Sequence, residues 1–491
     1  MRIRIVGTGV MGRGIAQWAA TAGHTVELAD ARPESVGEAI EFVRSMLDRA
    51  VAKGRASAEE AEAVAARLVP LDSPGKPGDD VELVVEAIRE DLDTKAALFA
   101  ELERVLPAGT VFASNTSSLP ITQIAATLSD PARLAGLHFF NPVPLMKIVE
   151  VIPGAKTRPE IVETLTSLVR ETGHRAVVVA DTPGFLINHA GRGLVTEALA
   201  LLEENVAEPA VLDRVARDVL GLRMGPFELM DLTGLDVTSA VIESVWRGFR
   251  YSDRLRASYL TPNRVAAGLH GRKTGRGWYD YSAEQPAEPP ITGDVARPVY
   301  AAEPAVQNAL AEAGARVETT LTDDAVVLVP TWGTTVAAAI AEHRLPAART
   351  FGVDPLSLPA ARRVLAVTPA SDPVAARDAA AVLSLGDKRV STVRDTPGSV
   401  AQRLLASIVS VACSIAERGI AAPADIDLGV TTGLGYPAGP LAWGDQVGAE
   451  RMLALQRALQ ETTGDPRYRP TRWLTERAQL GLPLTAPAAT L

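Results

Sequence analysis

The sequence predicts an α/β domain followed by an all-α domain, and then a degenerate repeat of both. Strand-like and helix-like segments alternate over residues 2–181, which favours a mostly parallel sheet with helices on both faces. From the tetrapeptide DTPG at 181–184 onward the pattern is helical. The same tetrapeptide recurs at 395–398, a displacement of 214 positions.

The repeat extends through the helical segments without a gap. The same displacement relates Pro209 to Pro423, Asp213 to Asp427, Leu220-Gly221 to Leu434-Gly435, Gly225-Pro226 to Gly439-Pro440, and Asp231 to Asp445. Because so many glycine, proline and aspartate positions stay in register, we predict a duplicated helical domain. The region before the second helical domain would be a shortened copy of the α/β domain.

These observations predict five segments along the chain. They are an α/β domain (1–182), a helical domain (183–281), a linker rich in Pro, Glu and Ala (282–298), a degenerate α/β domain (299–394) and a second helical domain (395–491). Residues 35–67 interrupt the first α/β alternation and are predicted to form two helices joined near Gly54.

Composition and charge limit the class of protein. With 491 residues, 47% of them hydrophobic and 22% charged, the chain has enough apolar side chains for a sizeable core. The formal net charge of −10, with no run of Lys or Arg, argues against nucleic acid and anionic membranes as partners. The single cysteine, Cys413, excludes an internal disulfide. We see no apolar leader and no uninterrupted apolar stretch of about 18 residues, so we expect a cytoplasmic protein.

A glycine motif follows the first predicted strand and opens the next helix. The segment GTGVMG contains Gly7, Gly9 and Gly12 with the spacing G-x-G-x-x-G, and Val10 and Met11 lie between the last two glycines. The first two glycines would permit a tight turn close to a pyrophosphate, and the third would let helix and strand pack closely. The helix N-terminus would face the anion. This context predicts a Rossmann-type dinucleotide-binding domain.

Asp30, at the end of the next predicted strand, indicates which dinucleotide binds. It lies 23 positions after Gly7, where an acidic residue typically binds the ribose diol. Its carboxylate would repel a 2′-phosphate, so NAD is the predicted cofactor. Arg32 could instead accept that phosphate, with a solvated surface arginine as the alternative. No metal ion is expected.

A histidine and a glutamate lie on two consecutive predicted strands. His138 is near the end of one strand, and Glu150 lies in the next, after a loop broken by proline. If the strands are adjacent the side chains could meet, and the carboxylate would fix the tautomer of an imidazole that acts as a general base. From the residues alone, a core histidine and a surface glutamate explain the pair equally well.

Five segments together resemble the L-3-hydroxyacyl-CoA dehydrogenase family. They are GTGVMG, VVEAIREDLDTK, SNTSSLPIT, GLHFFNPVPLMKIVEVI and DTPGFLINH, and the resemblance covers residues 1–281 and, in degenerate form, 299–491. The organisation is similar to the long two-unit members, among them the 3-hydroxybutyryl-CoA and 3-hydroxyadipyl-CoA dehydrogenases of phenylacetate breakdown. The resemblance implies reversible, NAD-dependent oxidation of an L-3-hydroxyacyl-CoA to a 3-oxoacyl-CoA, the reaction type of β-oxidation of fatty acids.

The resemblance also implies a role for each catalytic residue. His138 would take the proton of the substrate hydroxyl, and Glu150 would orient and stabilise His138. Ser117 and Asn188 would hold the substrate oxygens near the nicotinamide, which suits neutral polar groups because they do not trap an alkoxide as a fixed charge would. Alternatively, Asn188 could cap its helix and Ser117 could be a turn residue.

Further binding residues follow from the same resemblance. Glu90 and Lys95 would contact the cofactor, and Lys95 and Asn141 would line its nicotinamide side, Lys95 also meeting substrate. A solvated helix face is the alternative for Lys95. The helical pair at 35–67 would cover the CoA moiety, with Ser45 and Lys53 as the expected contacts.

One residue departs from the family pattern. His189 stands where an arginine is expected after Asn188, whereas the second copy has Gln402 and Arg403 there. We interpret His189 as structural.

The second copy is predicted to be inactive. Residues 299–394 contain no G-x-G-x-x-G, and the repeat places Phe351 or Gly352 opposite His138, Val364 opposite Glu150 and Gln402 opposite Asn188. With no base, carboxylate partner or phosphate turn expected there, we predict one active site per chain. The second helical domain would bury the face that shorter members use to dimerise, giving a monomer with an internal pseudo-dimer, or else a homo-oligomer.

Two other functions stay open. One is a dehydrogenase of a small 3-hydroxy acid without CoA, which the helical pair at 35–67 disfavours. The other is a non-enzymatic dinucleotide sensor, which has no need of His138, Glu150, Ser117 and Asn188 together.

Overall fold

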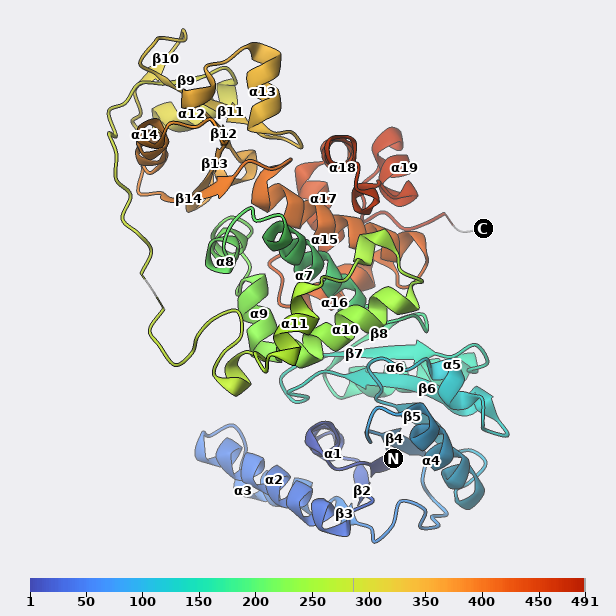
Figure 1. Cartoon of the computed structure of the whole chain (residues 1–491). Coiled ribbons are helices and arrows are strands. Elements are labelled where there is room, and N and C mark those ends of the chain that lie inside the picture. Colours follow the sequence, from blue (N-terminus) through green and yellow to red (C-terminus); the bar gives the residue numbers. More distant parts are fainter. Residues whose placement is uncertain (286, 490–491) are drawn as a thin grey trace. The chain divides into compact units, whose positions relative to one another are not determined.

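The computed structural model describes every residue except 286, 490 and 491. Its chain divides into two compact units (Figure 1). Unit 1 contains Met1–Asn188 and Gly419–Leu434, and unit 2 contains His189–Arg418 and Gly435–Leu491. Each unit has its own β-sheet.

Unit 1 is built on an eight-stranded sheet with the order β3-β2-β1-β4-β5-β6-β7-β8. Neighbouring strands are parallel except for β6 and β7, which are antiparallel. The strands are β1 (Arg2–Val6), β2 (Thr25–Ala29), β3 (Leu68–Pro70), β4 (Leu83–Glu86), β5 (Val111–Ser114), β6 (Leu134–Phe139), β7 (Ile148–Pro153) and β8 (Arg175–Val178). The predicted mostly parallel sheet is confirmed, and the short edge strand β3 was not predicted.

The helices of unit 1 begin where the sequence carries helix-start residues. Pro33 occupies the first turn of α2, and Ser57 forms a capping box with Glu60 at the start of α3. The predicted helical pair is confirmed, with Gly54 at a positive φ between the two helices. The helices that precede Asn188 are α1 (Val10–Thr21), α2 (Pro33–Ala52), α3 (Ala58–Ala65), α4 (Leu92–Val105), α5 (Ile121–Ala125), η1 (Pro131–Arg133) and α6 (Pro159–Glu171).

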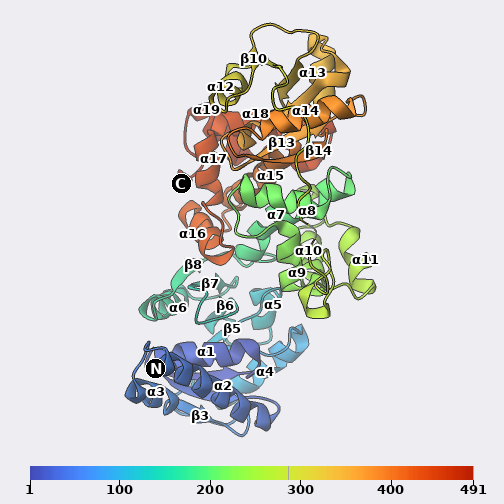
Figure 2. The same ribbon diagram turned by 90° about the vertical axis from the view of Figure 1, so that its left-hand side faces the viewer.

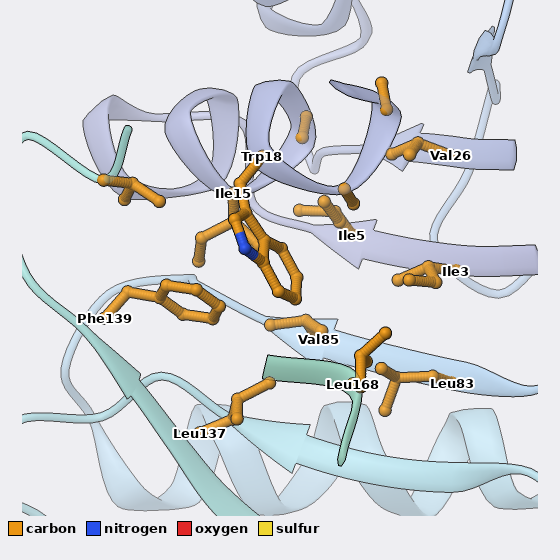
Figure 3. Packing of buried hydrophobic residues seen from close by; sticks show 14 of the residues in the cluster. Ile3, Ile5, Ile15, Trp18, Val26, Leu83, Val85, Leu137, Phe139 and Leu168 are labelled. Carbon is orange, nitrogen blue, oxygen red and sulfur yellow. The ribbon is translucent and has the colours of Figure 1, made fainter. Parts of the chain in front are cut away.

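An apolar core fixes α1 against the first sheet (Figure 3). Trp18 of α1 packs edge-on against Phe139 of β6, with ring centroids 4.8 Å apart. Ile5 of β1 and Val85 of β4 belong to the same buried cluster. Because this cluster holds α1 in place, it also positions the glycine turn that connects β1 to α1.

A helix from the far end of the chain also belongs to unit 1. Helix α16 (Pro423–Gly433) packs on β7 and β8 and lies beside both strands in two views (Figures 1 and 2). Just before α16, the carbonyl of Ile420 accepts a hydrogen bond from the N–H of Ala180 at 2.8 Å. The sequence predicted the duplicated helical domain but not its contact with the first sheet.

Unit 2 contains a six-stranded sheet with the order β10-β9-β11-β12-β13-β14. As in unit 1, one pair is antiparallel, here β12 and β13. The strands are β9 (Val299–Ala301), β10 (Val317–Glu318), β11 (Val326–Pro330), β12 (Thr350–Val353), β13 (Arg362–Val367) and β14 (Arg389–Arg394). The described residues of the predicted linker, 282–298, form neither helix nor strand, and Glu288 in it pairs with Arg362 of β13.

The remaining helices belong to the two predicted helical domains and to residues 299–394. They are α7 (Ile187–Glu203), α8 (Pro209–Asp218), α9 (Pro226–Thr233), α10 (Leu235–Gly248), η2 (Asp253–Leu255), α11 (Leu260–Ala266), η3 (Arg272–Thr274), α12 (Pro304–Glu312), α13 (Val336–His343), η4 (Ala347–Arg349), η5 (Pro355–Ser357), α14 (Pro373–Leu383), α15 (Ser399–Glu417), α17 (Pro440–Val447), α18 (Ala449–Thr463), η6 (Pro466–Tyr468) and α19 (Arg472–Leu480). Helix α8 packs on β13 and β14, and the N–H of Arg394 donates to the carbonyl of Val206 at 2.9 Å. This contact is the reciprocal of the one between Ala180 and Ile420, because Arg394 lies 214 positions after Ala180 and Val206 lies 214 positions before Ile420.

The two helical domains are in direct contact within unit 2. A Cβ at Gly193 of α7 would lie 2.9 Å from the Cα of Ile408 in α15, so these helices cross at backbone contact. The buried carboxylate of Glu197 in α7 accepts hydrogen bonds from Arg403 at 2.7 Å and from Tyr468 at 2.6 Å. The predicted internal pseudo-dimer requires such a contact.

Helix α15 is long and apolar enough to cross a membrane by length and composition alone, with a mean hydropathy of 1.5. Gln402 and Arg403 interrupt its apolar run, so it is not an uninterrupted apolar stretch of about 18 residues. In the structure 94% of this stretch is buried inside the protein, so packing in the core accounts for its composition.

Candidate active site

The glycine turn between β1 and α1 is shaped by close backbone contacts. Gly7 has a φ of +94°, and a Cβ there would lie 2.6 Å from the carbonyl oxygen of Ala87. A Cβ at Gly12 would lie 1.8 Å from the carbonyl oxygen of Gly7, so only glycine permits this packing of helix on turn. At Gly9 a Cβ would meet nothing within 4 Å, and no side chain caps α1 there. Open space and uncapped N–H groups at this helix start fit a pyrophosphate.

The two residues between the last glycines of the turn differ in burial. Val10 is 56% exposed at the first position of α1, whereas Met11 packs against the core of unit 1. An exposed valine beside the open space at Gly9 is consistent with a surface that a ligand covers.

Asp30 lies at the carboxyl end of β2, facing the glycine turn. Its carboxylate accepts hydrogen bonds from the N–H of Thr8 at 2.8 Å, the hydroxyl of Thr8 at 3.1 Å and the N–H of Arg32 at 3.0 Å. Partial burial would raise the pKa of Asp30, but these hydrogen bonds outweigh it and hold the pKa below its ordinary value. The residue is therefore a fixed anion where a ribose diol would bind.

The side chains of His138 and Glu150 meet between adjacent antiparallel strands. His138 of β6 and Glu150 of β7 are direct cross-strand partners, and the His138 Nδ1 lies 2.6 Å from the Glu150 Oε2. His138 is 5% exposed and Glu150 is fully buried. A surface glutamate is therefore wrong as an interpretation of Glu150.

Backbone groups hold the other carboxylate oxygen. The N–H groups of Leu186 and Ile187 each donate to the Glu150 Oε1 at 2.9 Å. The preceding turn has two successive left-handed residues, Gly184 at φ +74° and Phe185 at φ +50°. A left-handed conformation costs a non-glycine residue about 1 kcal/mol, and burial of the Phe185 ring maintains it. This turn aims both N–H groups at Glu150.

The arrangement fixes the tautomer of His138. A carboxylate oxygen only accepts, so Nδ1 carries the proton and Nε2 keeps its lone pair. Among the described residues, none hydrogen-bonds Nε2. The rings of Phe140 and Phe185 lie 4.4 and 5.8 Å from the imidazole, centroid to centroid. His138 thus presents one proton-accepting nitrogen in an apolar setting.

Lys95 is buried in a network of carboxylates at the end of β4. Its Nζ contacts the carboxylate of Glu86 and lies 3.3 Å from that of Glu90, and its side chain is 1% exposed. Glu86 is fully buried and accepts a further hydrogen bond from Ser114 at 2.6 Å. A solvated helix face is therefore wrong as an interpretation of Lys95.

Glu90 joins this network to the turn after β5. Its Oε1 accepts hydrogen bonds from the hydroxyl of Thr116 at 2.6 Å, the N–H of Ser117 at 2.9 Å and the N–H of Ser118 at 3.0 Å. Burial would raise the pKa of Glu90, but the hydrogen bond of Thr116 and the charge of Lys95 lower it. The ionised carboxylate thereby fixes the turn that carries Ser117.

Comparison with known proteins identifies the family of this chain. Residues 2–182 match the domain described as "3-hydroxyacyl-CoA dehydrogenase, NAD binding domain". Residues 184–281 and 398–486 match "3-hydroxyacyl-CoA dehydrogenase, C-terminal domain". The chain belongs to the 3-hydroxyacyl-CoA dehydrogenase family. The duplication of the helical domain, predicted from the repeat, agrees with the two matched regions.

Both long and short 3-hydroxyacyl-CoA dehydrogenases are similar to this chain. It is 38% identical over 479 residues to the 3-hydroxyadipyl-CoA dehydrogenase of Escherichia coli (strain K12), covering 97% of each. It is 39% identical over 280 residues to the probable 3-hydroxybutyryl-CoA dehydrogenase of Bacillus subtilis (strain 168), covering 57% of this chain and 97% of that protein. The crystal structure of 3-hydroxybutyryl-CoA dehydrogenase from Escherichia coli K12 substr. MG1655 superimposes with a TM-score of 0.88 at 37% identity, covering 98% of each chain.

Three further residues expected at the active site of this dehydrogenase lie in loops or at a helix start. Ser117 is exposed on the turn held by Glu90, and Asn141 is exposed in the loop after β6. Asn188 is half-buried and is the second residue of α7, one position after the helix begins. It therefore lies within the first helical turn and not at the N-cap.

The two residues expected to contact CoA lie on α2. The hydroxyl of Ser45 donates to the carbonyl of Phe42 at 2.8 Å, which leaves its oxygen able to accept a further bond. Lys53 is exposed at the C-terminal end of α2 and forms no ion pair with any described residue. The structure does not bring Ser45 and Lys53 into contact with His138.

His189 is buried in unit 2, with its ring 4.4 Å from that of Phe249. Burial first, and then the positive charges of Arg418, Arg192 and Arg254, lower its pKa to about 3. A neutral, buried imidazole agrees with the structural role inferred from the sequence.

Sequence reasoning missed two residues that organise this site. Glu86 anchors Lys95, and the Asn115 Oδ1 accepts a hydrogen bond from the N–H of Phe139 at 2.8 Å, which ties the end of β5 to the end of β6. Glu86 is the last residue of the buried strand β4, and Asn115 directly follows the buried strand β5. A polar residue at the end of a buried strand is the signal that could have identified both.

The repeat was predicted to place Phe351 or Gly352 at the position of His138 and Val364 at that of Glu150, but neither Phe351 nor Gly352 faces Val364 across β12 and β13. Val353 pairs with Leu365, so the next residue, Asp354, lies opposite Val364, and its N–H donates to the Val364 carbonyl at 3.3 Å. The register of an antiparallel pair depends on both strands, and one fixed displacement does not describe it. Val364 itself carries no carboxylate, whereas Asp354, across from it, is a buried acid.

Gln402, which the displacement of 214 relates to Asn188, is hydrogen-bonded to Asp354. Its Nε2 donates to the Asp354 Oδ1 at 3.1 Å, and its Oε1 accepts from the N–H of Gly333 at 3.0 Å. Burial raises the pKa of Asp354 to about 6, against the opposing hydrogen bonds of Gln402 and neighbouring N–H groups. Asp354 and Gln402, the side chains that would meet a substrate in this copy, are thus hydrogen-bonded to each other.

Proposed function

We propose that this 3-hydroxyacyl-CoA dehydrogenase uses His138 as its general base and Glu150 as the residue that orients it. The contact of 2.6 Å between the His138 Nδ1 and the Glu150 Oε2 carries the proposal. His138 Nε2 accepts the proton of the substrate 3-hydroxyl, and the Glu150 carboxylate stabilises the imidazolium that forms. In the reverse direction, the same imidazolium returns the proton to the 3-oxo group.

The residues of unit 1 fit NAD as cofactor. Gly7, Gly9 and Gly12 leave space for the pyrophosphate at the start of α1, beside Val10 and Met11, while Asp30 accepts the ribose hydroxyls. When bound, NAD supplies the acceptor for the hydride that leaves C3 of the substrate. Lys95 and Glu90 hold the turn at Ser117 from one side, and Asn141 lines the nicotinamide side.

We further propose that neutral donors hold the substrate. The hydroxyl of Ser117 and the amide of Asn188 bond the 3-hydroxyl and thioester oxygens without a fixed charge to trap the alkoxide. Ser45 and Lys53 on α2 meet the CoA moiety, and the exposure of Lys53 supports this assignment.

The acyl group is proposed from the named relatives. Proteins similar to this chain over nearly their whole length are named 3-hydroxyadipyl-CoA and 3-hydroxybutyryl-CoA dehydrogenases. We therefore propose a short-chain or dicarboxylic 3-hydroxyacyl-CoA, as in phenylacetate breakdown, as substrate.

The test is the rate of NADH oxidation with acetoacetyl-CoA and with free acetoacetate. We expect turnover with the CoA ester and a much lower kcat/KM with the free acid. His138→Gln should lower kcat by roughly 10²-fold or more, because it removes the general base. A wild-type rate in this variant would refute the proposed role of His138, and a preference for the free acid would refute the CoA ester as substrate.

Residues 299–394 are proposed to be the degenerate α/β repeat. Three features support this. The antiparallel pair β12–β13 has the position of β6–β7, Asp395 caps α13 as Asp181 caps α5, and Gly398-Ser399 repeats the left-handed turn at Gly184-Phe185. The five segments of the sequence analysis, with boundaries at 182, 281, 298 and 394, remain our proposed domains.

The assembly and location of the enzyme are proposals as well. The reciprocal contacts of α8 with β13–β14 and of α16 with β7–β8 support a monomer with an internal pseudo-dimer. A homo-oligomer is the other possibility, which the molecular mass in solution decides. We propose a cytoplasmic location, and the net charge of −10 supports an enzyme without nucleic acid or anionic membrane partners.

A further inference from the structure

Helices α8 and α16 are counterparts in the two copies, and α16 has glycine at two of the positions where the sequences differ. Displacement by 214 relates Val215 of α8 to Gly429, and Val219, the residue after α8, to Gly433, the last residue of α16. Glycine in a helix interior costs roughly 0.5–1 kcal/mol relative to alanine, so Gly429 needs a reason, and Gly433 lies four residues later on the same helical face.

Close packing in unit 1 supplies the reason. A Cβ at Gly429 would lie 2.8 Å from the Leu186 Cδ2, and a Cβ at Gly433 would lie 2.7 Å from the Ile187 Cδ1. Leu186 and Ile187 are almost fully buried. The face of α16 that carries Gly429 and Gly433 therefore packs closely against the side chains of Leu186 and Ile187 at the start of α7.

Leu186 and Ile187 are the same two residues whose N–H groups bond the Glu150 Oε1. Their side chains contact α16 while their backbone contacts Glu150, which in turn contacts His138. A chain of direct contacts thus runs from the second copy to His138.

We propose that α16 positions the His138–Glu150 pair, with Gly429 and Gly433 as positioning residues. The glycines let α16 approach closely enough to fix Leu186 and Ile187, and these hold the Glu150 carboxylate in line with the imidazole. The second copy would thereby contribute to catalysis at the active site of the first. This inference deepens the proposed function and rests on the roles assigned there to His138 and Glu150.

The second copy shows the complementary pattern in its sequence. The counterparts of Leu186 and Ile187 are Val400 and Ala401, which are smaller, while α8 has valines in place of the glycines. In both copies the displacement thus pairs larger side chains with smaller ones, with the bulk on opposite sides. Substitution of valine at Gly433 together with alanine at Ile187 therefore recreates a pair that this chain already contains.

The test is a cycle of four proteins, comprising the wild type, Gly433→Val, Ile187→Ala and the double variant. We expect Gly433→Val to lower kcat about tenfold or more, because a displacement of an ångström at a reacting group has effects of that size. The dissociation constant of NADH should stay within twofold of wild type, since the glycine turn is untouched. Ile187→Ala in the Gly433→Val background should restore most of the lost kcat.

Ala424→Val is the matched control. Ala424 is exposed on α16, so this variant introduces the same side chain without meeting Leu186 or Ile187. Should Gly433→Val fail to fold, Gly433→Ala takes its place in the cycle, with a smaller expected loss and the same expected rescue.

An unchanged kcat in the folded Gly433 variant would overturn the inference, and so would a loss of kcat equal to that of Ala424→Val. A double variant whose kcat is no higher than that of the single Gly433 variant would overturn it as well. His138→Gln separates this failure from failure of the proposed function. If His138→Gln abolishes turnover while the Gly433 variants keep it, only the role of α16 is refuted.

Discussion

The Glu150 carboxylate bonds the His138 imidazole through one oxygen and the backbone of Leu186 and Ile187 through the other. All four residues are buried, so water does not compete for these hydrogen bonds. This relationship connects a cross-strand pair of the first sheet to the first turn of α7. It makes the position of His138 depend on how the helical domain begins, and it leads to the first prediction.

Glu150→Gln should lower kcat roughly 10- to 100-fold while leaving NADH affinity within twofold of wild type. A glutamine oxygen still accepts the two backbone N–H groups, but a neutral amide does not stabilise the imidazolium. Stopped-flow measurement of NADH oxidation together with a fluorescence titration of NADH checks this. Equal losses in kcat and NADH affinity would indicate a collapsed fold and contradict the specific role.

Lys95→Met should destabilise the NAD-binding domain by about 3–5 kcal/mol, because it leaves the buried carboxylate of Glu86 without its cation. The midpoint of thermal unfolding measures the effect. The double variant Glu86→Gln/Lys95→Met should recover much of the loss, since no buried charge remains. Lys156→Met, at an exposed lysine, is the control and should leave the midpoint unchanged.

Asp30→Asn should raise the ratio of kcat/KM for NADP to that for NAD about tenfold, which corresponds to roughly 1.4 kcal/mol. The amide retains an acceptor for Thr8 but no longer repels a 2′-phosphate. Assays with both cofactors at equal substrate concentration check the ratio. The exposed Asp79→Asn is the matched control; an identical ratio in both variants would remove Asp30 from cofactor selection.

Asp354→Asn should raise thermal stability at neutral pH and leave kcat unchanged. The pKa of Asp354 is raised from 3.8 to about 6 by burial, so between these values the folded protein binds a proton that the unfolded chain has released. Stability from this group is therefore full below about pH 4 and is lost as the pH rises through about 6. The neutral asparagine lacks this loss.

Unfolding midpoints of wild type and Asp354→Asn at pH 4.5 and 7.5 check this prediction. The advantage of the variant should be larger at pH 7.5. The same advantage at both pH values would mean that Asp354 does not titrate in this range, and a lower kcat would contradict the single active site per chain.

Much of the first domain was predictable because its signals are local. The strand–turn–helix at Gly7 to Gly12, the acid at Asp30, and the placement of His138 and Glu150 on consecutive strands all depend on short stretches of chain. The structure agrees with each of them. The duplicated helical domain was also predictable, because glycine, proline and aspartate positions stay in register over many turns.

Other features depended on contacts between distant segments. Lys95 has the sequence context of an exposed helix, and only the fold brings Glu86 and Glu90 around it. Asp354, and not Phe351 or Gly352, lies opposite Val364, because the register of β12 and β13 is set by both strands and their connection. Neither result could be reached by reading one segment at a time.

The sequence by itself determined the kind of sheet, the dinucleotide turn, the His138 and Glu150 pair and the duplication, since local backbone preferences and a repeated pattern fix these. Only the tertiary structure decided that α16 of the second copy packs on the first sheet against Leu186 and Ile187. The physical reason is that Gly429 is unfavourable within its own helix, and the close packing that Gly429 and Gly433 permit involves side chains more than two hundred residues away in the chain.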